Sequence, residues 1–454
     1  MKPGFYTIMA AQFFSSLADN ALLVAAIALL AQLAGPAWMV PMLKFFFVVS
    51  YVALAAWVGA FADSMPKGRV MFITNLIKVG GCMMMLVHQF LAPDGVPEYV
   101  LVLLAYAVVG FGAAAYSPAK YGILTELLPP QQLVAANGWI EGTTVGSIIL
   151  GTVLGGALVS TVVSAKLLAI DIPGVETWID TGPEAAIVVI AFFYGVAALF
   201  NLFIPDTGVD HRQPSNNPVF LIREFSHCVS LLWRDRLGQI SLATTTLFWG
   251  AGATLQFIVL KWAEESLGMN LSQGAILQAV VAVGIAIGAV VAATKVTLRQ
   301  APSILPVGVA MGLIVMVLAM YSRDMGPHGG FELALGGKSF TVPWYVLVAS
   351  GILMIVGSLA GFFVVPMNAL LQHRGHVLMG AGHSIAVQNF NENLAILTML
   401  ACYAGMISAD LSIRTVILIF GIFVSATMFM VVLRHRHNQA RGDSLHLIGM
   451  EKPH

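Results

Sequence analysis

Apolar runs long enough to cross a lipid bilayer recur along the whole chain and constrain its fold more than any other feature. A helix of roughly 20 apolar residues spans the hydrocarbon core. Backbone polar groups find no water inside the bilayer, so such runs must be helices that satisfy their own hydrogen bonds. Loops separate twelve runs, which lie near 5–33, 42–62, 70–91, 99–122, 137–160, 185–205, 239–262, 273–294, 304–322, 344–370, 383–408 and 413–433. The sequence therefore predicts an all-α membrane protein of twelve transmembrane helices.

The composition is typical of a protein in a membrane and not of one in water. Hydrophobic residues make up 58% of the 454 residues and charged residues 10%, whereas roughly 25% of a soluble domain is charged. The first run starts at Phe5 and shows no small-residue cleavage site, so we expect a first span and not a removed signal peptide. The cysteines Cys82, Cys228 and Cys402 are too dispersed for a metal site. We predict neither a metal nor a cofactor.

Lysine and arginine are distributed unevenly between the two sides of the predicted membrane domain. With both ends of the chain on one side, fourteen of the 22 basic residues lie in or near the loops of that side, against five in the opposite loops. Such an excess marks the cytoplasmic side of a membrane protein. We therefore expect both termini in the cytoplasm.

The two halves of the chain repeat weakly. Residues 13–20 of the first run have a counterpart at 248–255 in the seventh, and 112–118, which close the fourth run, are echoed by 360–366 in the tenth. Repeats offset by half the chain are typical of transporters that handle cargo between two six-helix halves. A duplicated packing arrangement without transport would look similar. We predict an N-terminal half at 1–205, a cytoplasmic linker at 206–238, a C-terminal half at 239–434 and a cytoplasmic tail at 435–454.

The predicted linker contains an amphipathic segment. Phe220, Phe225, Val229 and Leu232 recur at helical spacing among charged residues such as Arg223. This pattern predicts a helix at the cytoplasmic membrane surface. A plain connection between the two halves would occupy the same position, so contact with lipid is one of two interpretations.

The loop between the second and third runs carries a gating signature. Residues 59–69 resemble the loop signature of the major facilitator superfamily, in which Gly-x-x-x-Asp is followed by a basic turn. The aspartate can face the N-terminus of a neighbouring helix, while the basic residues stay at the cytoplasmic surface. The match is partial, because Ser64 stands where the signature has arginine. We expect Asp63, Lys67 and Arg69 to act in gating.

Three longer stretches carry a more specific resemblance. They are AQFFSSLADNALL at 11–23, YSPAKYGIL at 116–124 with ANG at 136–138, and GFFVVPMNALLQ at 361–372 with AVQN at 386–389. Together they resemble the bacterial lysophospholipid transporter family. The resemblance implies the major facilitator fold and a flippase of the bacterial inner membrane, which moves lysophosphatidylethanolamine and related lysolipids from the outer to the inner leaflet. It also implies an inner-face acyltransferase and acyl carrier protein synthetase as partners, and we expect a monomer with no nucleic-acid partner.

Polar residues in the first and fourth runs are candidates for headgroup binding. Gln12 and Asp19 share one face of the first predicted helix, with Asn20 beside them, and a charge at this depth is costly unless it is paired or hydrated. Lys120, near the cytoplasmic end of the fourth run, offers a phosphate the opposite charge, and Tyr116 lies one turn before it. The alternatives are that Asp19 and Lys120 pair with protein groups, or that Lys120 snorkels to the interface.

The fifth, seventh and eleventh runs add further amides and carboxylates. Such groups inside a membrane helix are costly unless they face a polar cavity, and an interhelical hydrogen-bond network is the alternative. Lys78 and His383 receive no proton-relay role, because a lone histidine at a helix end is more often structural. The additional candidates for substrate binding are Asn137, Glu141, Gln256, Gln388, Asn389 and Glu392.

No enzyme signature is found in the sequence. Residues 336–339 resemble part of a phosphate-binding loop, but Glu332 occupies the position of its first glycine, so we predict a transporter and not an enzyme. Two alternatives stand beside lysophospholipid transport: a proton-coupled exporter of drugs or small solutes, with Asp19 as proton carrier, and a non-transporting membrane scaffold or receptor. A flippase needs a cavity between the halves that is polar near Asp19, Glu141 and Gln388 and opens sideways to the bilayer.

Overall fold

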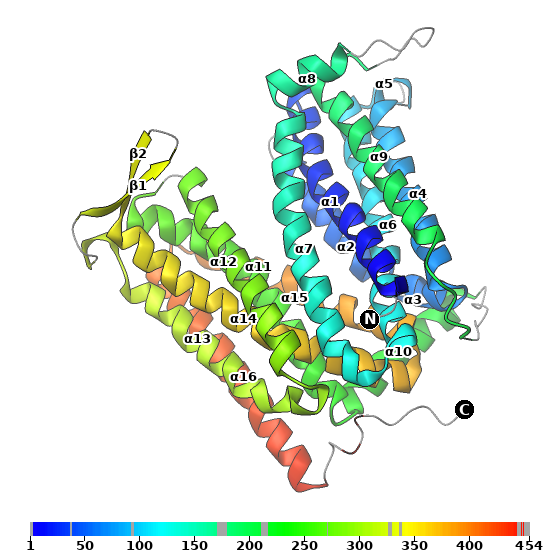
Figure 1. Cartoon of the computed structure of the whole chain (residues 1–454), viewed down its shortest axis with the longest axis vertical. Coiled ribbons are helices and arrows are strands. Elements are labelled where there is room, and N and C mark those ends of the chain that lie inside the picture. Colours follow the sequence, from blue (N-terminus) through cyan, green and yellow to red (C-terminus); the bar gives the residue numbers. More distant parts are fainter. Residues whose placement is uncertain are drawn as a thin grey trace. The chain divides into compact units, whose positions relative to one another are not determined.

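The computed structural model is mainly helical and describes residues 3–36, 39–91, 95–169, 179–209, 217–269, 271–325, 329–335 and 338–442, with 446 and 448. Within these ranges, eleven helices are long and apolar enough to cross a membrane, and a bent pair of shorter helices raises the number to as many as twelve (Figure 1). The predicted all-α architecture is therefore confirmed.

Each predicted run has a corresponding helix or helix pair. The spanning elements are α1 (Pro3–Gln32), the pair α2 (Met39–Ala53) and α3 (Ala55–Asp63), α4 (Lys67–Leu86), α6 (Glu98–Leu127), α7 (Pro130–Leu158), α9 (Gly182–Leu202), α11 (Gly238–Leu267), α12 (Leu271–Lys295), α13 (Leu305–Met320), α14 (Trp344–Met379), α15 (Ala381–Ser408) and α16 (Ile413–Ala440). The shorter elements are α5 (His88–Leu91), α8 (Thr161–Leu168), α10 (Pro218–Arg234), the 3-10 helices η1 (Leu298–Ile304) and η2 (Arg323–Met325), and the strands β1 (Gly330–Leu335) and β2 (Lys338–Pro343).

The second span is bent, which the sequence did not predict. Its two helices, α2 and α3, meet at an angle of 64° on either side of Leu54. One turn before the bend, Ser50 Oγ donates a hydrogen bond to the Phe46 carbonyl at 2.9 Å. Back-bonding of this kind by serine often bends helices. Hydropathy misses the bend because the apolar run continues across it.

Several helices extend beyond the predicted runs. The prolines that the sequence suggested as closing the fourth and tenth spans, Pro118 and Pro366, lie inside continuous helices that end only at Leu127 and Met379. Both prolines are buried, and packing there maintains the helix although proline donates no backbone hydrogen bond. α7 begins before its predicted start because Pro130 suits a first helical turn.

The chain forms two compact units, and each contains a segment from the other half of the sequence. Unit 1 consists of Met1–Pro129, Gly146–Leu231 and Leu378–Phe390. Unit 2 consists of Pro130–Val145, Leu232–Val377 and Asn391–His454. The helices α7 and α15 therefore each have residues in both units. The boundaries given above for the halves, the linker and the tail stay a prediction.

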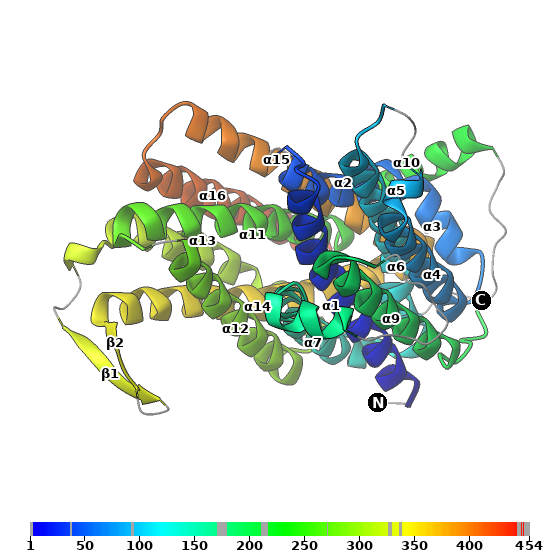
Figure 2. The ribbon, with the colours of Figure 1, turned by 90° about the horizontal axis from the view of Figure 1, so that it is seen from above.

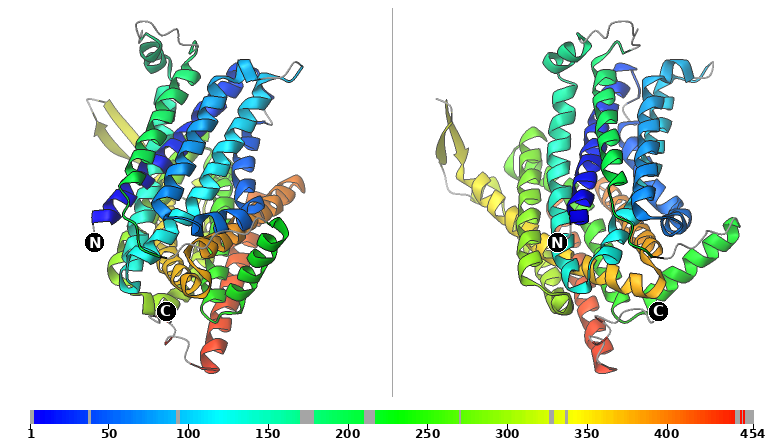
Figure 3. Two further views of the ribbon diagram at one scale, coloured as in Figure 1. Left: turned by 90° about the vertical axis from the view of Figure 1, so that its right-hand side faces the viewer. Right: turned by 45° about the vertical axis from the view of Figure 1, so that its right-hand side comes forward.

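Unit 1 is built on a bundle of α1, α4, α6 and α9 (Figure 3). α4 packs against both α6 and α9, while α1 packs against α9 and α2 against α6. Its core joins Leu22 of α1 to Tyr106 of α6 and Ile190 of α9. A Cβ atom at Gly81 would lie 2.5 Å from Val109 Cγ2, so α4 and α6 approach closely only because this residue is glycine.

Unit 2 packs α13 against α16, and α11 against both α12 and α16 (Figure 2). Trp262 of α11 is fully buried, and its indole N–H donates to the Tyr321 carbonyl at 3.3 Å. A Cβ atom at Gly284 of α12 would lie 2.5 Å from the Met354 carbonyl oxygen of α14. Small residues thus set the helix spacing in this unit as well.

The amphipathic segment predicted in the linker lies in the helix α10. Leu221 and Phe225 are buried, and the Phe225 ring lies edge-on to that of Phe390 with centroids 5.4 Å apart. Phe220 and Ile222 are exposed. The apolar face therefore packs partly on protein, and its contact with a membrane surface stays a prediction.

A two-stranded antiparallel hairpin lies in the long loop before α14. Its register runs from the pair Gly330 and Pro343 to the pair Leu335 and Lys338. The sequence predicted no strands here, because an all-α pattern dominates the chain. The long loop at 161–184 contains Asp171 and Glu176, which lie outside the described residues.

Candidate functional site

An ion pair between Asp19 of α1 and Lys78 of α4 forms a polar centre in unit 1. Lys78 Nζ donates to Asp19 Oδ1 at 2.9 Å and to Oδ2 at 3.0 Å. It also donates to Ser15 Oγ at 3.0 Å, and Ser15 donates to Asn75 Oδ1 at 2.8 Å. The Tyr194 hydroxyl of α9 donates to Asp19 Oδ1 at 2.6 Å. Two further helices thus fix the position of one carboxylate on α1.

The two members of this pair differ in exposure. The Asp19 side chain is 21% exposed, whereas that of Lys78 is 1% exposed. The rings of Tyr116 and Tyr194 flank the ammonium, with centroids 5.0 and 5.3 Å from Nζ. Charges in such surroundings are tolerated because they are paired, and removal of one partner is strongly destabilising. Of the two groups, the carboxylate has the larger surface open to a ligand.

The sequence left open whether Asp19 faces a ligand or pairs with a protein group, and the structure shows a protein partner. The sequence does not identify that partner, Lys78, although it is the only charged residue in the third apolar run. It lies 59 positions from Asp19 in sequence. The pairing depends on how α1, α4 and α9 pack, which hydropathy alone does not specify.

The other predicted residues of the first and fourth spans occupy different environments. Gln12 in α1 and Tyr116 in α6 are buried. Asn20 donates its side-chain N–H to the Ser16 carbonyl of its own helix at 2.8 Å. Lys120 is half-buried, with Nζ 4.2 Å from the centroid of the Tyr121 ring, a cation–π contact. An aromatic ring therefore helps to hold the ammonium of Lys120.

A second polar contact of unit 1 joins α6 to the beginning of α15. Asn389 donates its side-chain N–H to Ser117 Oγ at 2.9 Å, and the neighbouring Gln388 is buried. The interhelical hydrogen-bond network considered for the eleventh run is thus present at Asn389.

Unit 2 has a corresponding contact between α7 and α14. Asn137 and Gln372 exchange two side-chain hydrogen bonds, each of 2.9 Å. About one turn further along this helix pair, Asn368 donates to Glu141 Oε1 at 3.4 Å. All four side chains are buried. Each hydrogen bond between Asn137 and Gln372 therefore satisfies a polar group that would otherwise be costly to bury.

The predicted substrate residues are divided between the two units. Asp19 and Gln388 belong to unit 1, whereas Glu141 and Glu392 belong to unit 2. Glu392 is buried and Gln256, also of unit 2, is exposed. The expected cavity near Asp19, Glu141 and Gln388 involves residues of both units and stays a prediction.

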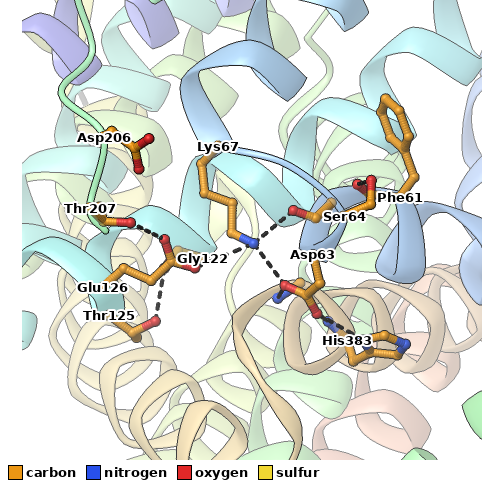
Figure 4. A network of polar contacts seen from close by, with 12 residues as sticks. Phe61, Asp63, Ser64, Lys67, Gly122, Thr125, Glu126, Asp206, Thr207 and His383 are labelled. Atoms are coloured by element: carbon orange, nitrogen blue, oxygen red, sulfur yellow. Dashed lines mark hydrogen bonds and ion pairs between the residues drawn. The ribbon is translucent and has the colours of Figure 1, made fainter. Parts of the chain in front are cut away.

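The predicted gating loop forms a network around Asp63 (Figure 4). Asp63 Oδ1 accepts hydrogen bonds from Lys67 Nζ and from the Gly382 backbone N–H, both at 2.7 Å. Its Oδ2 accepts the His383 backbone N–H at 3.0 Å and lies 2.7 Å from the ring Nδ1 of the same histidine. Lys67 Nζ also lies 3.3 Å from Glu126 Oε1. Lys67 therefore stands between two carboxylates.

Asp63, the last residue of α3, contacts the N-terminal end of α15. A negative charge at that end is stabilised by the free backbone N–H groups and the helix dipole. A Cβ atom at Gly382 would lie 2.6 Å from Asp63 Oδ1, so glycine is needed there. The sequence did not identify Gly382, His383 or Glu126 as members, because α15 and α6 bring them from distant positions. Arg69 is exposed and forms no ion pair with any described residue.

A family model described as "Major Facilitator Superfamily" matches residues 8–397 of the chain. The chain is also similar to the "Lysophospholipid transporter LplT" of Yersinia enterocolitica, with 40% identity over 409 residues that cover 90% of this chain and 88% of that protein. The protein of the same description from Yersinia pestis is 40% identical over 398 residues, which cover 87% of this chain and 85% of that protein.

Solved structures with a similar fold are distant in sequence. A bacterial homologue of the iron transporter ferroportin in an outward-facing state has a TM-score of 0.69 at 12% identity and covers 97% of this chain and 100% of that one. The transporter FucP in its outward conformation has a TM-score of 0.67 at 14% identity and covers 96% and 98%. These similarities concern the fold alone.

Proposed function

The chain belongs to the major facilitator superfamily and, within it, to the lysophospholipid transporter family, and from this premise we propose that it carries lysophospholipids across the membrane. The proposed cargo is lysophosphatidylethanolamine and related single-chain lipids, moved from the outer to the inner leaflet. The observation that carries the proposal is the 40% identity over 90% of the chain with a transporter of that description.

Asp19 is proposed to hold the ammonium of the ethanolamine headgroup. Its carboxylate is partly exposed, and Lys78 and Tyr194 fix its position. Charge-assisted hydrogen bonds are roughly twice as strong as neutral ones. Lys78 is a positioning residue, since its ammonium is buried. Lys120 is proposed to attract the phosphate.

The remaining members of the proposed substrate site are polar or aromatic side chains of both units. They would surround the headgroup once it has entered and satisfy its ester and hydroxyl oxygens. They are Gln12, Asn20, Tyr116, Asn137, Glu141, Gln256, Gln388, Asn389 and Glu392.

The acyl chain of the cargo needs an apolar path. Exposure of each methylene to water costs about 0.8 kcal/mol, so a sixteen-carbon chain costs about 12 kcal/mol. This exceeds the free energy that a few headgroup contacts supply. We therefore propose that the headgroup moves through a polar cavity while the chain remains in the bilayer or in an apolar groove.

Unit 2 has an apolar groove that suits this path. It lies among α11, α15 and α16 and has a volume of about 620 Å³. Leu247, Leu394 and Phe423 are among the side chains that line it, and Gln239 and Arg434 bring polar groups to it. Arg434 Nε donates to Gln239 Oε1 at 3.1 Å. The groove is therefore mainly apolar, and these two polar groups are bonded to each other.

Asp63, Lys67 and Arg69 are proposed to act in gating. Asp63 binds the beginning of α15, and Lys67 links it to Glu126 of α6. Any movement of residues 381–383 away from α3 must break the contacts of Asp63. Arg69 is proposed to act from the surface beside this network.

We also propose the setting in which the protein works. The basic residues favour a cytoplasmic position for both termini, and the family favours the bacterial inner membrane. There the protein would act as a monomer and without catalysis of its own. An inner-face acyltransferase and acyl carrier protein synthetase would use the delivered lysolipid.

Flipping of labelled lysophosphatidylethanolamine by the purified protein in proteoliposomes tests the function. We expect protein-dependent movement of the label between leaflets. The same vesicles, with and without a proton gradient, separate the alternatives. Gradient-driven transport of soluble cations without lipid movement would identify an exporter of small solutes, and no transport of either class would favour a scaffold or receptor.

A further inference from the structure

A further pocket, which does not include the Asp19–Lys78 pair, lies in unit 1. It has a volume of about 390 Å³ and is bounded by the start of α4 and the end of α9. Gly68 and Arg69 line it from α4, and Asn201, Ile204 and Asp206 line it from α9 and the residues after it. None of the proposed substrate residues lines this pocket.

Asn201 is an unusual member of the pocket. It is 1% exposed, and neither its side-chain oxygen nor its side-chain nitrogen has a hydrogen-bond partner among the described residues. Burial of an unsatisfied amide is unfavourable, and native proteins contain few such groups. A polar ligand in the pocket would supply both the donor and the acceptor that the amide lacks.

Two opposite charges line the same pocket without neutralising each other. Arg69 and Asp206 are exposed, and no described residue forms an ion pair with either. The Arg69 and Val70 backbone N–H groups donate to the Pro66 carbonyl, whereas the first N–H groups of a helix, here those of Lys67 and Gly68, have no acceptor within the helix. This helix start attracts a phosphate.

We propose that the pocket binds the phosphoethanolamine headgroup of a membrane phospholipid. The phosphate would contact Arg69 and the start of α4, and the ammonium would contact Asp206. Asn201 would donate its side-chain N–H to the phosphate and accept a hydrogen bond from the ammonium at its side-chain oxygen. A simple anion would be repelled by Asp206, and a simple cation by Arg69, so a zwitterion complements the pocket best.

The pocket is connected to the gating network through Glu126 (Figure 4). Thr207, next to Asp206, donates to Glu126 Oε2 at 2.8 Å, and Lys67, two residues before Arg69, lies 3.3 Å from Glu126 Oε1. The start of α4 and the residues after α9, which form the two sides of the pocket, therefore both contact the Glu126 carboxylate through Lys67 and Thr207. A bound headgroup would hold the walls together and so stabilise the contacts of Lys67 with Asp63 and Glu126.

Lipid titration followed by native mass spectrometry tests the site without any need for transport activity. We expect phosphatidylethanolamine to bind more tightly than phosphatidylglycerol, which lacks the ammonium, and than phosphatidylcholine, whose quaternary ammonium cannot donate to Asp206. Arg69→Gln and Asp206→Asn should each weaken binding about tenfold, as expected for loss of one charge-assisted hydrogen bond. Arg223→Gln, at an exposed position of α10, is the matched control and should change nothing.

Asn201→Leu provides a second measurement. Because it removes an unsatisfied buried amide, it should raise the melting temperature in lipid-free detergent and abolish the further rise that phosphatidylethanolamine causes in the wild-type protein. Equal binding of the three lipids, or unchanged binding in both charge variants, would overturn the proposal. Binding of free phosphoethanolamine without binding of the lipid would overturn the lipid as ligand. Since binding is read directly, these outcomes are separate from a failure of the protein to flip lysolipids.

Discussion

We expect substitutions of single ionisable residues to have large effects on stability in this chain, because few other charges lie inside its helices. Beyond the first turn of α4, Lys78 is the only charged residue of that helix, and its ammonium depends on Asp19 for neutralisation. Removal of one member of a buried pair typically destabilises a protein by about 3–5 kcal/mol, because the other charge remains buried alone. The partial exposure of Asp19 reduces this effect for the carboxylate but not for the ammonium.

The ion pair gives the first prediction. We expect Lys78→Met to lower the melting temperature and to remove most of the flipping activity, because Asp19 loses the group that holds it. The double variant Asp19→Asn with Lys78→Met removes both charges, so it should recover much of the stability without recovering transport. Thermal unfolding and proteoliposome flipping measure the two effects. Lys261→Met, which breaks the exposed pair with Glu265 on α11, should alter neither.

Asp19→Asn alone separates the structural from the functional role of the carboxylate. It should lower flipping strongly, and it should also lower the melting temperature, because the buried Lys78 ammonium loses its counter-charge, whereas the double variant keeps most of its stability. Wild-type flipping in this variant and in the double variant would show that Asp19 serves the fold and not the headgroup.

Lys120 gives the second prediction. Its ammonium lies over the Tyr121 ring, half-buried at the end of α6 that the sequence places near the cytoplasm. Lys120→Ala should lower flipping several-fold with little change in stability, since the contact with the ring is worth only about 0.5–1 kcal/mol near a surface. Lys166→Ala, at an exposed position of α8, is the control. Unchanged flipping would mean that Lys120 only anchors α6 at the interface.

At the scale of whole elements, the apolar runs were sufficient to predict the helices but not their ends. Hydropathy detects the part of a helix that lies in lipid, and α16 continues from the predicted end at 433 to Ala440 through residues such as Arg434 and Arg436. Helical hydrogen bonding needs no apolar side chains, so the polar extension is invisible to this criterion. The sequence did not reveal the bend between α2 and α3, because apolar residues continue across it and hydropathy shows no interruption there.

At the polar sites, the sequence predicted some of the residues but not the partners that they contact. Asp63 and Lys67 were identified because a local signature marks them, and Asp19 because a carboxylate is rare in an apolar run. Their partners Gly382 and Lys78 lie 319 and 59 positions away. Such contacts follow from tertiary packing, which one sequence without its structure does not specify.

The contact of Asp63 with the start of α15 gives the third prediction. Gly382→Ala would place a methyl group where Asp63 Oδ1 lies only 2.6 Å away, so the carboxylate should lose its backbone hydrogen bonds. We expect slower flipping and faster hydrogen exchange at the first turn of α15. Gly405→Ala in the same helix is the matched control, because no neighbouring atom lies within 4 Å of the methyl group that it would gain, and it should behave as wild type. Equal behaviour of the two variants would argue against a gating role for Asp63.

At the scale of the molecule, the helices α7, α10, α14 and α15 each contribute residues to both compact units. α7 contributes Pro130–Val145 to unit 2 and its remaining residues to unit 1, and α15 contributes residues up to Phe390 to unit 1, together with the end of α14. Any rearrangement of one unit against the other must therefore bend or displace α7 and α15. The contact of Asp63 with Gly382 holds the start of α15 within unit 1, and the contact of Asn137 with Gln372 holds the start of α7 within unit 2.

The last prediction concerns the path of the acyl chain along unit 2. Leu394 of α15 lines the apolar groove among α11, α15 and α16 and is 44% exposed. Leu394→Arg would place a charge where the chain is expected to lie, and a charge at membrane depth is costly unless it is paired or hydrated. We expect flipping of lysophospholipid to fall at least several-fold. Leu313→Arg is the matched control, since Leu313 is 51% exposed on α13 of the same unit and does not line the groove. Both variants should be compared at equal melting temperature and equal incorporation into vesicles. Equal flipping by the two would exclude the groove from the path of the chain and leave the open bilayer as its route.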